Sequence, residues 1–368
     1  MSESGIMLDM SFSENNQAVR HNEDGVVLLQ IGYFEEAEKE FHEAITLNPK
    51  YLAPHYNLGC LYGQLNRYDE ALVEFQEVVR MNPEDGLAFF SLGETYDLLS
   101  LVEKATEAYE KARELIPQEY GVWNNLGNCY RKMGRFEDAM GCYRKVFTLK
   151  EDFFGAHFNL GMVLLDTNRL EEAKEAFQKA VFYGPNHSNA HYHLGLVLGR
   201  MGWNEEEVEE YREAIRLNPD SASIYYNLGV AFGELERHED ALAAFNETLK
   251  RDPDFFEALT NSGVVCFHLK RLPEAIHFFL EALRINPDDY LAHNSLAECY
   301  IQQGRYRIAL VECAKGLQFH PNEGSLHFNL GLASWKIGDQ KTAYCEYSRL
   351  KKLGEETLAV DLWDTMEE

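Results

Sequence analysis

Long hydrophobic runs are missing from this chain. None of its apolar stretches approaches the roughly 18 residues that a membrane-spanning helix needs. The first residues, MSESGIMLDMSFSENNQ, carry acidic side chains and no basic one ahead of a short apolar patch, which is the opposite of a signal or transit peptide. These features predict a cytoplasmic protein that does not insert into membranes.

Basic side chains are scarce. The 368 residues include 34 Lys and Arg against 61 Asp and Glu, which gives a formal net charge of −27. A surface this acidic repels the phosphate backbone of nucleic acids and the headgroups of anionic lipids. We therefore expect no nucleic-acid partner.

Paired cysteines and catalytic motifs are also missing. The seven cysteines are odd in number, scattered along the chain and never spaced as C-x-x-C, so we expect reduced thiols. No glycine-rich phosphate loop, G-x-S-x-G elbow or H-E-x-x-H motif occurs. Among the histidines only His187 and His191 show i, i+4 spacing, which falls short of the converging ligands that a zinc site needs. We predict a protein that is not an enzyme and has no cofactor or metal.

What the chain does have is a repeat of 34 residues. Glu151 takes the one position in the series where the proline is replaced. A period kept over most of the chain indicates that each repeat is one supersecondary unit that stacks on its neighbours. Eight of the ten prolines keep this spacing: Pro49, Pro83, Pro117, Pro185, Pro219, Pro253, Pro287 and Pro321.

Three columns of residues recur when each repeat is numbered so that this proline is position 32. Position 8 is Gly, position 20 is Ala and position 24 is aromatic, each in nine of ten repeats. The exceptions are Ala297 at position 8, Glu207 at position 20 and Cys313 at position 24. Small residues at positions 8 and 20 let two helices approach closely, and the aromatic side chain fills the space beside them. Position 4 is a histidine in six repeats, which we interpret as a flat side chain packed between helices: His21, His55, His157, His191, His293 and His327.

Each repeat is expected to be a pair of helices. Positions 1 to 14 have helical periodicity, Gly, Asn or Ser often follows at position 15, and a second helix ends before the proline. The pattern resembles the tetratricopeptide repeat, and the resemblance implies an all-α, right-handed superhelical solenoid. A flexible leader over residues 1–17 and a capping helix over residues 358–368 would flank ten repeats. The repeats would span 18–51, 52–85, 86–119, 120–153, 154–187, 188–221, 222–255, 256–289, 290–323 and 324–357.

The resemblance also implies where a partner binds. In tetratricopeptide proteins, positions 2, 5, 6, 9, 12 and 13 of the first helix line a concave groove that holds most ligands. Position 6 is Asn in six repeats, and two interpretations stay open: the amides brace the local backbone, or they form a ladder that pairs with the backbone of an extended peptide. The strings HYNLG and FNLG look like the repeats of O-linked N-acetylglucosamine transferase, where such a ladder holds peptides. The asparagine row consists of Asn57, Asn125, Asn159, Asn227, Asn261 and Asn329.

Aromatic and basic side chains add to the groove positions. The position-5 rings serve either helix packing or the anchoring of a partner, and they are Tyr56, Phe90, Phe158, Tyr192, Tyr226 and Phe328. The fourth repeat adds a basic cluster, which is either an ordinary solvated face or a seat for a carboxylate. This cluster consists of Asn124, Asn125, Asn128, Arg131 and Lys132, with Arg200 two repeats further on.

We predict a non-enzymatic scaffold or adaptor whose groove binds a peptide segment of a partner protein through the asparagine row and the aromatic side chains. The alternative is a regulatory or targeting subunit of an enzyme, or of a secretion or assembly machine, encoded elsewhere. Self-association is a further hypothesis, in which the apolar stretch from Ile6 to Phe12 inserts into the groove of a neighbouring copy.

Overall fold

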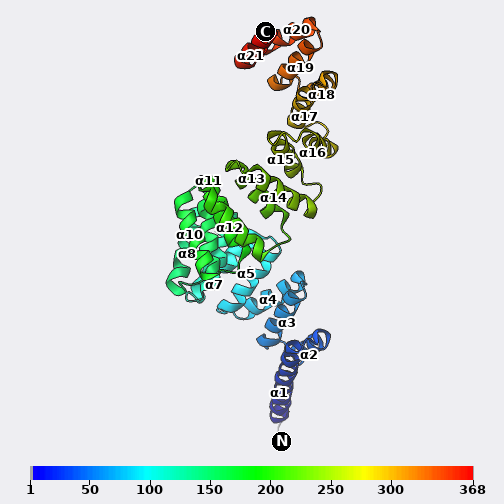
Figure 1. Cartoon of the computed structure of the whole chain (residues 1–368). Coiled ribbons are helices and arrows are strands. Elements are labelled where there is room, and N and C mark those ends of the chain that lie inside the picture. Colours follow the sequence, from blue (N-terminus) through cyan, green and yellow to red (C-terminus); the bar gives the residue numbers. More distant parts are fainter. Residues whose placement is uncertain (1–2, 368) are drawn as a thin grey trace. The chain divides into compact units, whose positions relative to one another are not determined.

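The computed structural model describes residues 3–367, with side chains from residue 15 onward. Every regular element in this part of the chain is an α-helix, which confirms the predicted all-α class. The helices form two compact bodies, an N-terminal body that ends at Pro185 and a C-terminal body that begins at Asn186. Within each body, successive helices pair in order along the chain (Figure 1).

The helices alternate in length, as expected for a repeat. From α2 to α20, the even-numbered helices have 14 residues and the odd-numbered ones have 13. The N-terminal body contains α1 (Glu3–Gln30), α2 (Phe34–Leu47), α3 (Leu52–Gln64), α4 (Tyr68–Met81), α5 (Gly86–Leu98), α6 (Val102–Leu115), α7 (Tyr120–Lys132), α8 (Phe136–Leu149), α9 (Phe154–Asp166) and α10 (Leu170–Tyr183). The C-terminal body contains α11 (Ser188–Arg200), α12 (Asn204–Leu217), α13 (Ala222–Glu234), α14 (His238–Arg251), α15 (Phe256–His268), α16 (Leu272–Ile285), α17 (Tyr290–Gln302), α18 (Tyr306–Phe319), α19 (Gly324–Lys336), α20 (Gln340–Leu353) and α21 (Glu356–Glu367).

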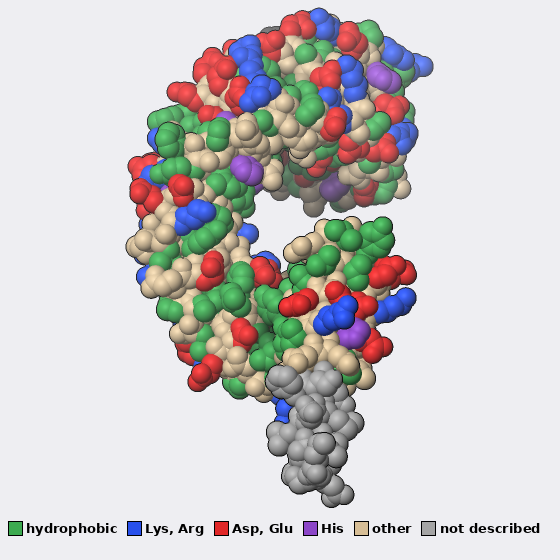
Figure 2. Space-filling model, turned by 90° about the horizontal axis from the view of Figure 1, so that it is seen from below, with side chains coloured by type: hydrophobic (Ala, Val, Ile, Leu, Met, Phe, Trp, Pro, Cys, Tyr) green, Lys and Arg blue, Asp and Glu red, His purple; other side chains and the backbone are tan. Residues whose placement is uncertain are grey.

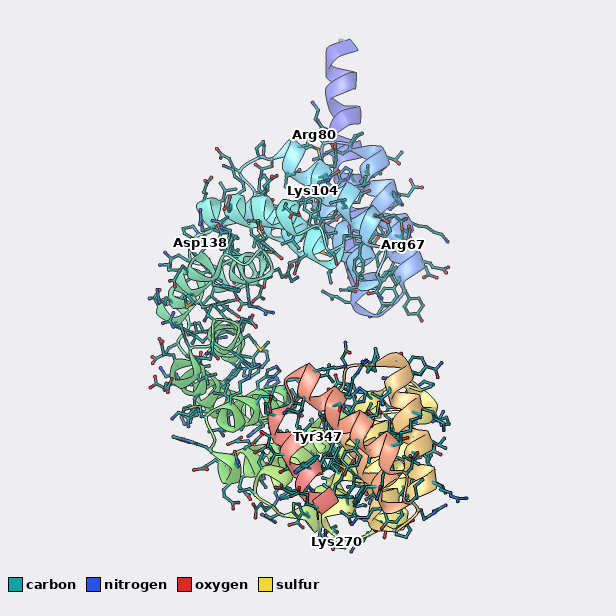
Figure 3. The ribbon with its side chains drawn as sticks, turned by 90° about the horizontal axis from the view of Figure 1, so that it is seen from above. Arg67, Arg80, Lys104, Asp138, Lys270 and Tyr347 are labelled. Atoms are coloured by element: carbon teal, nitrogen blue, oxygen red, sulfur yellow. The ribbon has the colours of Figure 1, made fainter. Side chains whose placement is uncertain are left out.

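The turn within each helix pair has the same backbone conformation in all ten repeats. The residue at position 15 is left-handed, with φ between 56° and 86°. Gly, Asn and Ser at this position predicted such a turn in most repeats, and the structure adds Glu236 and Lys270. These two residues lack the freedom of glycine and adopt a conformation that is unfavourable for a side chain with a Cβ atom. Lys270 lies in the turn between α15 and α16 (Figure 3).

Glycine at position 8 is explained by its contact with the aromatic ring at position 24. A Cβ atom built on Gly229 would lie 2.5 Å from the ring of Phe245, and equivalent ring contacts occur in each of the first eight repeats. The ring therefore leaves no room for a side chain at position 8. The two exceptions fall in one repeat: where Ala297 replaces glycine, Cys313 replaces the ring, and both residues are fully buried.

The position-4 histidines pack between helices and also make polar contacts. His293 and His327 are buried, and in each the Nε2 atom faces the carbonyl oxygen of the preceding repeat's proline. The Nδ1 atom faces a glutamate at position 23, a partner that the sequence analysis missed. At His327 the Glu346 carboxylate raises the pKa of the ring above its usual value. The glutamate contact spans 2.5 to 3.0 Å in five repeats: His21–Glu40, His55–Glu74, His191–Glu210, His293–Glu312 and His327–Glu346.

The two ends of the array differ from the interior repeats. Residues 3–17, expected to be a separate flexible leader, are the first part of α1, because that helix runs unbroken from Glu3 to Gln30. The side chains of the stretch from Ile6 to Phe12 lie outside the described residues. At the other end α21 begins at Glu356, two residues before the proposed capping segment, and packs against α19 and α20. Its Leu362 occupies the space beside Gly331.

Candidate functional site

Hydrogen bonds between neighbouring repeats run along the predicted groove positions. The side chain at position 5 of one repeat bonds to the side chain at position 6 of the next, 35 residues later. The Asn57 amide donates to Asn22 Oδ1 at 2.9 Å, and the Asn227 amide donates to the Tyr192 hydroxyl at 3.0 Å. Four further pairs share this spacing: Tyr56–Ser91, Asn124–Asn159, Tyr226–Asn261 and Asn294–Asn329.

The amide nitrogens of the asparagine row mostly brace one repeat against its neighbour, and Asn227 also donates to the Ser223 carbonyl oxygen of its own helix. Asn125 donates to the Tyr109 hydroxyl and accepts from Asn124. Asn329 is buried, with 3% of its surface exposed, because its amide is drawn to Asn294 and Glu298; this member cannot face a partner as expected. The Oδ1 oxygens of four members accept no hydrogen bond from any described residue: Asn57, Asn159, Asn227 and Asn261.

The aromatic side chains at position 5 are half-buried. The Tyr56 and Phe75 ring centroids lie 5.6 Å apart in an edge-on contact, so the position-5 ring supports the position-24 ring of its own repeat. Phe328 instead belongs to the hydrophobic cluster beneath α21. Thus packing accounts for the buried side of these rings, and the rest of each ring is partly exposed. The same contact with position 24 holds Phe90, Phe158, Tyr192 and Tyr226.

The basic cluster of the fourth repeat is neutralised within the protein. Arg131 lies 3.1 Å from Asp166, and Lys132 lies 2.6 Å from Asp97. Both ion pairs again span 35 residues, between position 12 of one repeat and position 13 of the next, a relation visible in the sequence once the stacking is known. Asn128 accepts a hydrogen bond from the Tyr143 hydroxyl.

These ion pairs favour the interpretation of an ordinary solvated face over a seat for a carboxylate, because acids of the adjacent repeats already pair with both cations. Arg200 is an exposed residue of α11 in the C-terminal body. On the face shown in Figure 2, acidic and basic side chains are likewise interspersed.

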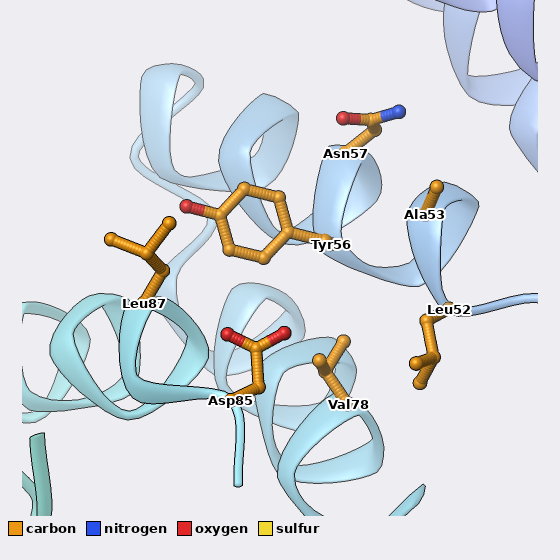
Figure 4. A pocket seen from close by; sticks show the side chains of 7 residues that line it. All are labelled: Leu52, Ala53, Tyr56, Asn57, Val78, Asp85 and Leu87. Carbon is orange, nitrogen blue, oxygen red and sulfur yellow. The ribbon is translucent and has the colours of Figure 1, made fainter. Parts of the chain in front are cut away.

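A pocket opens between α3, α4 and α5 of the second and third repeats, and no column of the repeat predicted it. Its volume is about 320 Å³. Val78 of α4 and Leu87 of α5 form apolar walls opposite α3, and the Asp85 carboxylate lies at the rim (Figure 4). The α3 residues that complete the lining are Leu52, Ala53, Tyr56 and Asn57.

Glu207, the exception to alanine at position 20, is buried in the C-terminal body, with 8% of its surface exposed. Gly199 on α11 leaves the space that its carboxyl group occupies, and the Tyr211 hydroxyl hydrogen-bonds to it. Burial raises the pKa of Glu207 to about 7, and the nearby Glu234 contributes in the same direction. In the sequence, Glu207 stands out only as the exception to alanine at position 20.

Within the described residues, no group of three or more His, Cys, Asp or Glu side chains is placed to hold a metal ion. None of the helices described is both long and apolar enough to cross a membrane.

Comparisons with known proteins identify the repeat. Family models described as tetratricopeptide repeat match residues 25–51, 56–120, 121–153, 154–187, 226–290 and 267–330, and a model described as TPR repeat matches residues 204–236. No curated protein matches the chain.

Solved structures match as well. The C-terminal part of a TPR repeat-containing protein from Cytophaga hutchinsonii is 14% identical, with a TM-score of 0.57 over 66% of this chain and 99% of that one, and supports the fold. YrrB, a TPR protein described as having an unusual peptide-binding site, is 25% identical, with a TM-score of 0.47 over 51% of this chain and 96% of its own. The pilF protein of Pseudomonas aeruginosa is 23% identical, with a TM-score of 0.48 over 57% and 96%.

Proposed function

The chain belongs to the tetratricopeptide repeat proteins, and on this basis we propose that it is a protein-interaction scaffold whose first helices hold an extended segment of a partner protein. The observation that carries the proposal is the set of amide oxygens left open in the asparagine row. Each of the four open members donates a hydrogen bond from its amide nitrogen to a neighbouring repeat. Its Oδ1 atom is therefore held in place and can still accept a hydrogen bond. Within the C-terminal body, Asn227 and Asn261 take the same position of successive repeats, and such fixed acceptors suit backbone N–H groups, which every peptide has whatever its side chains.

The half-buried rings at position 5 support the same function. Tyr192 and Tyr226 each carry the hydroxyl that receives an asparagine amide, so the ring and the amide oxygen are positioned together. Rigid aromatic side chains add contact area at little entropic cost, and they anchor partners in many interfaces. The asparagine row would then align the peptide backbone while the rings contact its side chains.

The test uses random dodecapeptides displayed on phage and selected on the full chain. Dissociation constants of the selected peptides are measured by fluorescence polarisation for the wild type, Asn227→Ala and Asn261→Ala. Each substitution removes one open acceptor, and since a neutral hydrogen bond contributes about 1 kcal/mol, we expect binding to weaken about fivefold.

Asn329→Ala is the matched control, because it removes the same kind of brace between repeats at a buried position. It should lower stability as much as the other two variants and leave binding unchanged. Equal weakening by all three variants, or unchanged binding to Asn227→Ala and Asn261→Ala, would overturn the proposal.

A further inference from the structure

We propose that the groove of the second and third repeats recognises a partner segment in which an apolar side chain stands beside a lysine or arginine. The inference rests on the proposed function of the groove and adds the chemistry of the segment. Two features of the N-terminal body support it: the apolar pocket beside Leu87, and two carboxylates near it, Asp85 and Glu94, that have no cationic partner among the described residues.

The pocket is large enough to hold a side chain, and its Leu87 wall is exposed to solvent. Pockets that hold small ligands range from roughly 300 to 1,000 Å³, and at about 320 Å³ this one is large enough for an apolar side chain of a peptide. Leu87 at its wall is 54% exposed, so part of its apolar surface faces water. A partner side chain placed between Leu87, Val78 and the Tyr56 ring would remove this exposed surface from water.

The carboxylates set the sign of the charge that fits beside the pocket. Asp85 accepts from the Ala88 backbone N–H with Oδ1 at 3.0 Å and so caps α5, and its Oδ2 atom bonds to no described residue. Glu94 follows Leu87 by seven residues on α5, which places both side chains on one stripe, with their Cα atoms about 10 Å apart along the axis. Surrounding side chains desolvate the Glu94 carboxyl group and so raise its pKa. The residue as a whole is nevertheless exposed to solvent, as expected for a carboxyl group in a concave surface.

The cations of the next repeat do not pair with these two carboxylates. One repeat further, the two cations on α7 are already paired with Asp97 and Asp166. No described lysine or arginine pairs with Asp85 or Glu94, so a cation supplied by the partner would complete them.

Charge also argues against the N-terminal stretch of this chain as the occupant of the pocket. The sequence MSESGIMLDMSFSENNQ contains acidic residues and no lysine or arginine. It offers the apolar side chains that the pocket would accept, but its charge has the wrong sign for Asp85 and Glu94. A second copy of this acidic chain fits poorly for the same reason, whereas a basic segment of another protein is complementary.

The experiment selects random dodecapeptides, displayed on phage, against the full chain, and keeps the clones whose capture is lost on Leu87→Ser. These clones should be enriched in Leu, Ile, Met or Phe next to Lys or Arg. Asp85→Asn keeps the N-cap oxygen and removes the charge, and Glu94→Gln is similarly conservative. Each is expected to weaken the binding of an enriched peptide about fivefold, and to reduce its dependence on salt.

Asp69→Asn is the matched control, since Asp69 is an exposed carboxylate of α4 outside the pocket; it should leave the affinity unchanged. Clones enriched in acidic residues, clones without any charge preference, or equal weakening by Asp69→Asn would overturn this inference while the groove still binds peptides. If no clone depends on Leu87, the pocket is not a binding site, and the asparagine variants of the C-terminal body then test the proposed function separately.

Discussion

The pairing of positions 8 and 24 leads to a prediction that can be worked from the structure. Gly229 has no room for a Cβ atom, because the atom would lie 2.5 Å from the ring of Phe245. In the ninth repeat Ala297 and Cys313 occupy the same two positions and are fully buried. We therefore expect Gly229→Ala and Phe245→Cys to be destabilising separately and to compensate for one another when combined.

The magnitudes follow from three contributions. Overpacking by one methyl group costs about 1–3 kcal/mol, and alanine instead of glycine within a helix returns up to about 1 kcal/mol. Loss of most of the Phe245 ring costs about 3 kcal/mol, because the ring is 2% exposed in the wild type. The overpacking disappears when the ring is absent, so the double variant should be more stable than the sum of the single variants by about 1–3 kcal/mol.

The assay is urea unfolding followed by circular dichroism, together with hydrogen exchange of the α13 and α14 amides, which reports local opening. Gly233→Ala is the control on the same helix, because no atom lies within 4 Å of a Cβ atom built there; it should be neutral or stabilising. Strictly additive effects of Gly229→Ala and Phe245→Cys would refute the explanation of the two columns.

Three further predictions concern buried charge and backbone conformation. Glu346 raises the pKa of His327 above its usual value. The contribution of this pair to stability is therefore complete below pH ~6.5 and is lost as the pH rises through the raised value. The stability that Glu346→Gln costs, measured by urea unfolding, should become smaller over that pH interval. Burial raises the pKa of Glu207 from 4.5 to about 7, so between these values the folded state keeps a proton that the unfolded chain has released, and stability falls as the pH rises through this interval. Glu207→Gln should be nearly neutral near pH ~4 and stabilising by up to about 3 kcal/mol near pH ~8. Lys270→Gly and Glu236→Gly should each stabilise the protein by about 1 kcal/mol in thermal unfolding, since both residues are left-handed.

Two of these predictions have a control in another repeat. His157 has no glutamate at position 23 of its repeat, and burial lowers its pKa, so its protonated ring should not be stabilised. For His327, a dependence of stability on pH that is the same in Glu346→Gln and in the wild type would contradict the role given to this residue. Asn66→Gly should change stability less than Lys270→Gly, because asparagine tolerates the left-handed conformation. If the stability of the wild type and Glu207→Gln responds equally to pH between 4.5 and about 7, the account of Glu207 is wrong.

The sequence was most informative where one repeat is sufficient. Helix pairs, the left-handed turn and the small residue at position 8 all involve residues within 34 positions of each other, and ten copies made their columns visible. It was less informative about contacts between repeats. The partner of Lys132 is an aspartate 35 residues earlier, and without the stacking of repeats both residues look like ordinary solvated charges.

The sequence by itself determined the architecture of this protein, because a 34-residue period with glycine opposite an aromatic ring permits only stacked helix pairs. Only the tertiary structure decided which amide oxygens of the asparagine row accept no hydrogen bond from the described residues. Asn227 and Asn329 occupy the same position in their repeats, yet the first is only partly buried and the second is 3% exposed. The difference depends on the neighbouring helices that contact each side chain, and these are set by stacking rather than by position in the repeat.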